Sequence, residues 1–300
     1  PFATESSDEM MHLEQVLDRL LLLGVGDDKD DIRASVFESL RPSLDHLISE
    51  SENVHCLIEA LNDESFEVRA SAMSVLSRVA HFDTLHVMPL VRQTLVKLMR
   101  QLQNSKDTHL KQESVQLLQA LVRGTNSLII PYVRPMLEPL IATLNDSHPA
   151  VVGAALSTIG ELAVVDPEVV REHVHHLFPR LIEALQDQSS VTKQQIAVVA
   201  LGKLVSSLGM VVEPYMSYPG LFRSMVEAIQ RSDAAASTLR LEALKTAGLL
   251  GALDSYVFNP HAEAPDRRQD AAEDLDLNED ASEDLSKSAI TRASSSDERE

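Results

Sequence analysis

The residue types best suited to chemistry in this sequence occur together in a short histidine-rich stretch, Glu172-His173-Val174-His175-His176. On a helix, His173 and His176 would share one face, because they are three residues apart, and they could bind a metal ion together with a carboxylate. No further ligand follows at a spacing typical of a metal site. We therefore predict no bound metal and interpret the stretch as a partly exposed helix surface.

Two other stretches carry weaker signs of ligand binding. Gly24-Val25-Gly26 is the nearest approach to a glycine-rich phosphate loop, but it lacks the third glycine and leads into aspartates that would repel phosphate. The aspartates of residues 27–31 would suit calcium, yet the glycine and final glutamate of an EF-hand loop are missing. No serine-hydrolase elbow, zinc-protease motif or kinase catalytic loop occurs. The sequence thus predicts no catalytic residue, no cofactor-binding residue and no cofactor.

The charge of the chain limits its partners. Its 46 acidic and 26 basic residues give a net charge of −20, which disfavours electrostatic binding to nucleic acid or to an anionic membrane. Cys56 is the single cysteine, so an internal disulfide is impossible and a cytosolic or nuclear compartment is favoured. Apolar runs such as residues 128–133 fall far short of the ~20 residues that span a bilayer. We predict protein partners, no nucleic acid and no transmembrane segment.

Composition divides the chain into three parts. Residues 1–10 are polar and we expect them to fray, residues 11–258 carry the folded solenoid, and residues 259–300 form a disordered acidic linker. Residues 261–300 hold 13 acidic and 5 basic residues, a net charge of −8, with few large aliphatic side chains. Because the sequence starts at proline and stops in this linker, we expect it to be a piece of a longer protein. The linker contains four candidate phosphorylation sites, Ser282, Ser294, Ser295 and Ser296.

Between these two ends, apolar residues recur at spacings of three and four, and no sustained alternation of apolar and polar residues occurs. This pattern indicates an all-α protein. The stronger signal is a repeat: an apolar or branched residue followed by a base recurs where the second helix of a pair would begin. The basic positions, with Val152 standing where one base is missing, are Arg33, Arg69, Lys111, Val152, Lys193 and Arg240. Their spacings of 36, 42, 41, 41 and 47 average about 41, which is typical of helical-hairpin repeats.

A second column lies six residues before the first. It contains Asp27, Asp63, Ser105, Asp146 and Asp187, and Asp233 one place out of step. Such residues in the turn between two helices can accept hydrogen bonds from free amides at the start of the second helix. They could also pair with a base of the neighbouring repeat, forming a ladder along the stack that is interrupted at Val152. We interpret the ladder as structural rather than as a ligand-binding strip.

From these columns we predict about six antiparallel helix pairs, near residues 11–40, 52–81, 84–124, 131–165, 168–208 and 219–254. Prolines support the register: Pro89, Pro131 and Pro219 suit the opening turn of a first helix, whereas Pro139 and Pro179 suit kinks. Small residues, including Gly153, Gly160 and Gly202, indicate helices that approach closely. The predicted fold is a HEAT or armadillo-type α-solenoid.

Four segments carry a family resemblance: LNDESFEVRASAMSVLSRVA (61–80), TIGELA (158–163), VVEPYMSYPGLF (211–222) and LLGALDSY (249–256). In this order they resemble the amino-terminal HEAT-repeat region of the target of rapamycin (TOR) kinases, members of the phosphatidylinositol-kinase-related family. The resemblance covers roughly residues 13–258. It departs from the general HEAT pattern at Val152, where an arginine is absent.

The resemblance implies a non-catalytic segment of a serine/threonine protein kinase that controls growth in response to nutrients. ATP and magnesium would belong to a kinase domain absent from these residues. The implied partners are Raptor-type or Rictor-type accessory subunits and a second TOR protomer. The implied location is the cytoplasm, with peripheral endomembrane or nuclear placement through the parent complex. Two alternatives remain open: a karyopherin-type nuclear transport receptor that binds basic cargo, and a phosphatase scaffold.

Overall fold

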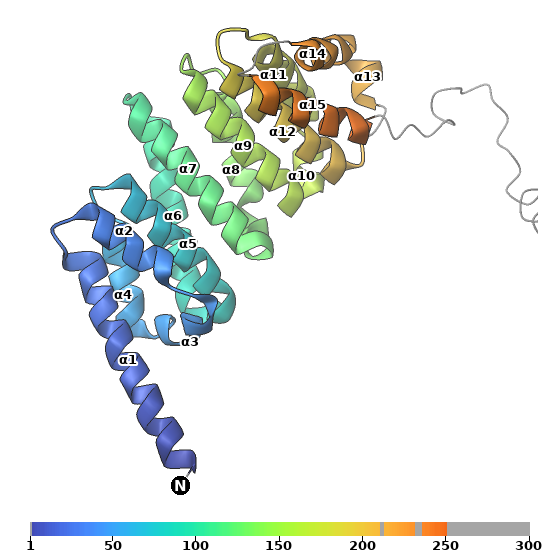
Figure 1. Ribbon diagram of the computed structural model, residues 1–300. Helices are drawn as coiled ribbons and strands as arrows, with labels where there is room; N and C mark the ends of the chain where they lie inside the picture. Colours follow the sequence, from blue (N-terminus) through green and yellow to red (C-terminus); the bar gives the residue numbers. More distant parts are fainter. Residues whose placement is uncertain (1, 211–212, 232–235, 251–300) are drawn as a thin grey trace, which may run out of the picture. The chain divides into compact units, whose positions relative to one another are not determined.

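The computed structural model describes residues 2–210, 213–231 and 236–250, and within these ranges all regular secondary structure is helical (Figure 1). The predicted acidic linker, its four serines and Asp233 lie outside the described residues. In chain order the elements are α1 (Phe2–Gly26), α2 (Asp30–Ser39), the 3₁₀ helix η1 (Pro42–Leu44), α3 (Asp45–Ile48), α4 (Ser51–Ala60), α5 (Phe66–Phe82), α6 (Thr84–Asn104), α7 (Thr108–Thr125), the 3₁₀ helix η2 (Asn126–Ile129), α8 (Ile130–Thr143), α9 (Pro149–Val165), α10 (Pro167–Arg171), α11 (Val174–Gln186), α12 (Val191–Leu208), α13 (Glu213–Ser217), α14 (Pro219–Gln230) and α15 (Ser237–Leu250).

The helices of residues 2–250 pack as successive antiparallel pairs in two layers. One layer consists of the second helices of the pairs, in the order α2, α5, α7, α9, α12 and α15, each in contact with the next. In the other layer α1 contacts α4, α4 contacts α6, α6 contacts α8, and α11 contacts α14. Figure 1 shows the pairs following one another in chain order. This arrangement confirms the all-α repeat fold and the six predicted pairs.

The core lies between the two layers and continues from repeat to repeat. On α7, Val115, Leu118 and Leu121 are fully buried, which is the three- and four-residue spacing that the sequence shows. Fully burying such a side chain contributes about 1.5–3 kcal/mol relative to leaving it exposed. A solenoid of this kind is therefore stabilised by contacts between neighbouring repeats.

Glycines allow the closest helix contacts. A Cβ atom added to Gly160 of α9 would lie 3.4 Å from the Ala200 Cα atom of α12, and one added to Gly124 of α7 would lie 2.2 Å from the Ser77 Cβ atom of α5. The second contact leaves no space for a side chain. The predicted close approach at Gly153 and Gly202 also occurs, against side chains of α12 and α15 respectively.

Three details differ from the sequence-based expectations. The backbone is helical from Phe2, so α1 begins before residue 11, where we expected the folded part to start. The segment 2–10 contains no proline or glycine to stop the helix, and its acidic residues suit a helix amino terminus. Pro89 lies inside α6 rather than in its opening turn, because Asp83 caps this helix by accepting the amide hydrogen of His86. Short helices η1 and α3 occupy residues 42–48, where no helix was expected.

None of the helices in the described ranges is both long enough and apolar enough to span a membrane.

Candidate functional site

The predicted ladder begins with Arg33 on α2. Its Nε and Nη2 atoms donate to the two carboxylate oxygens of Asp63, each at 2.8 Å, and its Nη1 atom donates to the carbonyl oxygen of Asp27, also at 2.8 Å. Both side chains of the ion pair are less than 10% exposed. The Arg33 hydrogen bonds outweigh burial and lower the pKa of Asp63. One arginine thus connects the turn of its own repeat with the turn of the next.

Arg69 on α5 repeats half of this pattern. Its Nη1 atom donates to the carbonyl oxygen of Asp63, six residues earlier, at 2.7 Å. The next turn offers Ser105, which cannot form an ion pair, and Arg69 instead donates from Nη2 to Glu113 of α7 at 2.7 Å. Glu113 was not among the predicted residues, although its position two residues after Lys111 places it beside the ladder.

Lys111 on α7 restores the direct connection, because its Nζ atom lies 2.8 Å from Asp146 Oδ2. In the following repeat, Val152 is buried and offers no base. Asp187 then pairs within its own repeat, accepting from Lys193 Nζ at 2.8 Å. This contact, together with hydrogen bonds from Ser189, lowers the pKa of Asp187. Among the described residues, Asp187 therefore has no ladder partner in the Val152 repeat, and the ladder is interrupted at this step.

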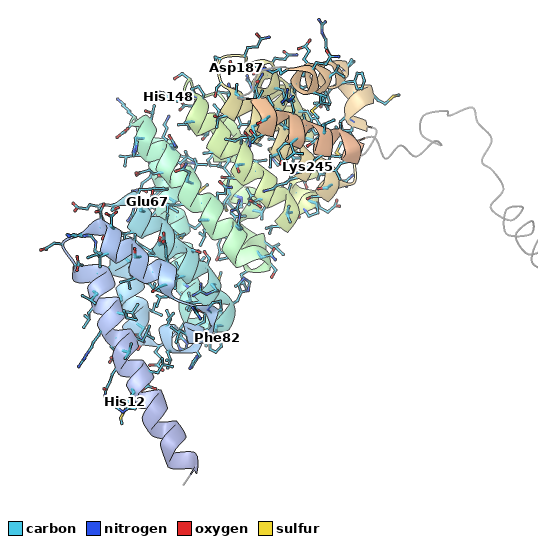
Figure 2. The ribbon with its side chains drawn as sticks, viewed as in Figure 1. His12, Glu67, Phe82, His148, Asp187 and Lys245 are labelled. Atoms are coloured by element: carbon cyan, nitrogen blue, oxygen red, sulfur yellow. The ribbon has the colours of Figure 1, made fainter. Side chains whose placement is uncertain are left out.

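The turn residues also bind the backbone. Each carboxylate accepts the amide hydrogen two residues ahead: Asp27 from Lys29, Asp63 from Ser65, Asp146 from His148, and Asp187 from Ser189. The Ser105 hydroxyl does the same for Asp107. The column thus fixes the turns as well as linking repeats, and Figure 2 shows His148 and Asp187 at the turns that lead into α9 and α12.

The last predicted base, Arg240 of α15, donates to the carbonyl oxygen of Arg231 at 2.8 Å. Its predicted neighbour in the column, Asp233, lies outside the described residues, so no ladder contact is assigned at this end.

A second charged connection was not predicted. Glu161 of α9 accepts hydrogen bonds from Arg123 Nε of α7 at 3.0 Å and from Lys203 Nζ of α12 at 2.8 Å, so one carboxylate joins three repeats. Burial alone would raise the pKa of Glu161, but the hydrogen bonds from Lys203 and Arg123 together lower it. The separations of 38 and 42 residues are close to the repeat period, and this spacing is the signal that could have revealed the group.

The histidine-rich stretch runs from the end of α10, at Glu172, into the first turn of α11. His173 is the residue before the helix, and its Nδ1 atom lies 3.1 Å from the carbonyl oxygen of Val169. The rings of His175 and His176 lie 4.0 Å apart. Across the described residues, no group of three or more histidine, cysteine, aspartate or glutamate side chains could hold a metal ion.

These paired charges are contacts between consecutive turns and helices. Their positions hold consecutive turns and helices in register, and the carboxylates of Asp63, Asp146 and Glu161 stay ionised beside cations rather than poised for proton transfer. What remains available for binding is the surface of the stacked helices.

Protein-family models match three parts of the chain. Residues 54–167 match the HEAT repeats of a stalled ribosome sensor GCN1-like family, and residues 150–204 match a HEAT-like repeat. Residues 211–299 match the serine/threonine-protein kinase mTOR domain.

Solved structures show the same architecture. An engineered protein aligns with 78% of this chain and 96% of its own at a TM-score of 0.53 and 18% identity. The crystal structure of Kap121p aligns with 80% of this chain and 26% of its own at a TM-score of 0.56 and 17% identity. At these identities the likeness concerns the fold alone.

Curated relatives cover most of the chain. It is 36% identical over 270 residues to the serine/threonine-protein kinase tor1 of Schizosaccharomyces pombe, a match that covers 90% of this chain and 11% of that protein. It is 35% identical to the serine/threonine-protein kinase TOR of Oryza sativa and 34% identical to that of Arabidopsis thaliana, covering 82% and 84% of this chain and 10% of each relative. The chain therefore spans about a tenth of the length of these relatives. With the HEAT-repeat fold and these matches together, the chain belongs to the target of rapamycin family and is similar to the HEAT-repeat region of its members.

Proposed function

We propose that this segment is a non-catalytic scaffold within a TOR-type kinase. Its role is to present a stack of helices on which the parent complex assembles. The observation that carries the proposal is the match of 90% of the chain to a TOR kinase of which it spans only 11%. A stack of repeats held in register by ion pairs suits such a role, because it offers extended helix surfaces of defined spacing.

The finer parts of the proposal concern the parent protein. Its serine/threonine kinase activity, with ATP and magnesium, would belong to residues outside this segment, which needs no cofactor of its own. Its partners would be Raptor-type or Rictor-type accessory subunits and a second TOR protomer. Its location would be the cytoplasm, with placement at endomembranes or in the nucleus through the complex.

The test uses the full-length parent protein with and without this segment. We expect deletion to reduce the co-purification of accessory subunits or the particle mass, measured by native mass spectrometry. We also expect the isolated segment to transfer no phosphate from labelled ATP to a protein substrate. A deletion that leaves both subunit composition and mass unchanged would overturn the scaffold role, as would phosphotransfer by the segment itself.

A control addresses the transport-receptor alternative. Binding of the segment to a basic localisation peptide, weakened steeply by salt, would favour that alternative, because an acidic solenoid attracts basic cargo. We expect no such binding in the assembled parent complex.

A further inference from the structure

Helix α6 differs in charge from the rest of this acidic chain. Over residues 84–104 it carries Arg92, Lys97 and Arg100 and no acidic residue. Helix α12 also lacks acidic residues, but its two lysines pair with carboxylates of neighbouring elements, Lys193 with Asp187 and Lys203 with Glu161. The bases of α6 have no such compensation.

The three bases of α6 differ from most other bases of the described ranges in having no carboxylate partner. Most bases of the described ranges pair with a carboxylate, as Arg33, Arg69 and Lys111 do. Arg92 and Arg100, by contrast, are exposed and have no hydrogen-bond or ion-pair partner among the described residues. Lys97 donates only to the neutral amide oxygen of Asn62, at 2.5 Å. Three positive charges therefore lie together on one helix without a neutralising anion.

These side chains form one continuous surface. Arg92, Val96 and Arg100 are spaced by four residues and share the exposed face of α6, whereas Val91, Leu95 and Leu98 face the core. The exposed face is hollowed between Pro89, Arg92, Lys97 and Arg100. We call this surface, formed by Arg92, Val96, Lys97 and Arg100, the α6 basic face.

A cavity opens beside the α6 basic face. It has a volume of about 240 Å³ and lies among α4, α5, α6 and α7. Gln93, Lys97 and Gln101 line both the cavity and the hollow, so the two are contiguous. Leucine side chains, including Leu61 and Leu90, form part of the cavity wall, and the ladder residues Asp63, Arg69 and Glu113 form another part. The positive charge of the α6 basic face thus adjoins a recess whose wall is part leucine and part polar.

We propose that the α6 basic face is a docking site for an acidic protein segment, with carboxylates on Arg92 and Arg100 and an apolar side chain in the adjacent cavity. The eight-residue spacing of the two arginines corresponds to about 12 Å along a helix. Acidic residues four apart in an extended peptide span about 13 Å, so such a segment fits both arginines. The net charge of −20 on the whole chain opposes the approach of an anionic membrane or a nucleic acid, whereas a short peptide meets only the local field.

This inference rests on the proposed scaffold role and specifies the chemistry of one partner. The test measures fluorescence anisotropy of the 300-residue chain with a labelled synthetic peptide of about a dozen residues, bearing glutamates four positions apart and a central leucine. A peptide with glutamine in place of each glutamate is the control ligand. We expect binding of the acidic peptide, weakening as salt rises from about 50 to about 300 mM.

The variants locate the site. We expect the pair Arg92→Glu and Arg100→Glu to weaken peptide binding at least tenfold, because it reverses the charge that attracts carboxylates. The pair Arg92→Lys and Arg100→Lys keeps that charge and should retain binding within about threefold. The matched control is Arg19→Glu with Arg41→Glu, two other exposed arginines without partners among the described residues. It makes the same change in net charge and should alter binding by less than about twofold. Thermal melting by circular dichroism checks that each variant is folded.

Several results would overturn the inference: equal losses in both pairs of variants, equal binding of the glutamine peptide, or tighter binding to vesicles of anionic lipid or to single-stranded DNA. If the acidic peptide fails to bind while deletion of the segment from the parent still removes accessory subunits, the scaffold role stands and only the α6 inference fails.

Discussion

Arg33 and Asp63, 30 positions apart in the sequence, meet through two parallel hydrogen bonds, with Nε 2.8 Å from Oδ2 and Nη2 2.8 Å from Oδ1. The same arginine holds the Asp27 carbonyl oxygen of its own turn. A single side chain therefore sets the distance between two consecutive turns. This geometry makes the ladder testable one link at a time.

Replacing Arg33 with methionine should lower the free energy of unfolding more than replacing Arg223 with methionine. The first change leaves the largely buried Asp63 carboxylate without its cation, whereas the second breaks an exposed pair between Arg223 and Glu227 on one helix. Exposed pairs of this kind contribute about 0.5 kcal/mol or less. Urea unfolding followed by circular dichroism measures both, and equal midpoints would argue against the ladder as a stabilising element.

The ladder also predicts a pH dependence. The pKa of Asp63 is lowered mainly by Arg33, and the pKa of Asp146 mainly by Lys111. A carboxyl whose pKa is lower in the folded state stabilises the protein above its unfolded pKa of about 4, and this contribution is lost as the pH falls through the folded value. We expect stability to decline below about pH 4, and less steeply in Asp63→Asn than in the unchanged chain. Urea midpoints between neutral and acidic pH would measure this, and parallel curves would contradict it.

The contact at Gly124 predicts a large effect from one methyl group. In Gly124→Ala the new Cβ atom would lie 2.2 Å from Ser77 Cβ, so α7 must shift away from α5, at a cost of about 1–3 kcal/mol. Gly248→Ala on α15 meets nothing within 4 Å and should stabilise the chain by up to about 1 kcal/mol, since alanine favours the helix. Opposite signs in thermal unfolding are the expected result. If both changes stabilise the chain, α5 and α7 are farther apart at Gly124 and Ser77 than the 2.2 Å contact implies.

The Glu161 connection predicts coupling across three repeats. Glu161→Gln keeps the shape of the side chain but removes the charge that Arg123 and Lys203 share, and should cost about 1–2 kcal/mol. A double-mutant cycle with Lys203→Met should give a non-zero interaction energy, whereas a cycle with Lys245→Met, whose ion pair is with Glu242 of its own helix, should be additive. Additivity in both cycles would mean that the 2.8 Å contact between Glu161 and Lys203 contributes nothing in solution.

The sequence was informative about the period and about the turns. An average spacing of about 41 and the columns at Arg33 and Asp63 were sufficient to place six helix pairs, because the same local problem, a turn between two amphipathic helices, recurs in every repeat. Proline marked a helix start less reliably than a capping residue did: Asp83 caps α6 six residues before Pro89, and the helix continues through this proline.

Contacts between repeats were harder to predict. Arg69 pairs with Glu113 because Ser105 provides no charge. Glu161 pairs with Arg123 of α7 and Lys203 of α12 only because the three stacked helices direct these side chains toward one another. A single sequence shows the period of such residues, but not which face of each helix meets the next. The α6 basic face could not be predicted for the same reason: only the structure shows that Arg92 and Arg100 have no carboxylate partner among the described residues.

Side-chain hydrogen bonds between repeats join positions about one period apart, from 30 residues for Arg33 and Asp63 to 48 for Thr246 and Val198. The loops closed during folding are therefore short, and their entropic cost is nearly the same at every step. Folding can begin at any pair of adjacent repeats and extend by adding one hairpin at a time. A terminal hairpin can also open while the remaining repeats keep their own contacts, so the resistance of this segment to unfolding is graded along its length.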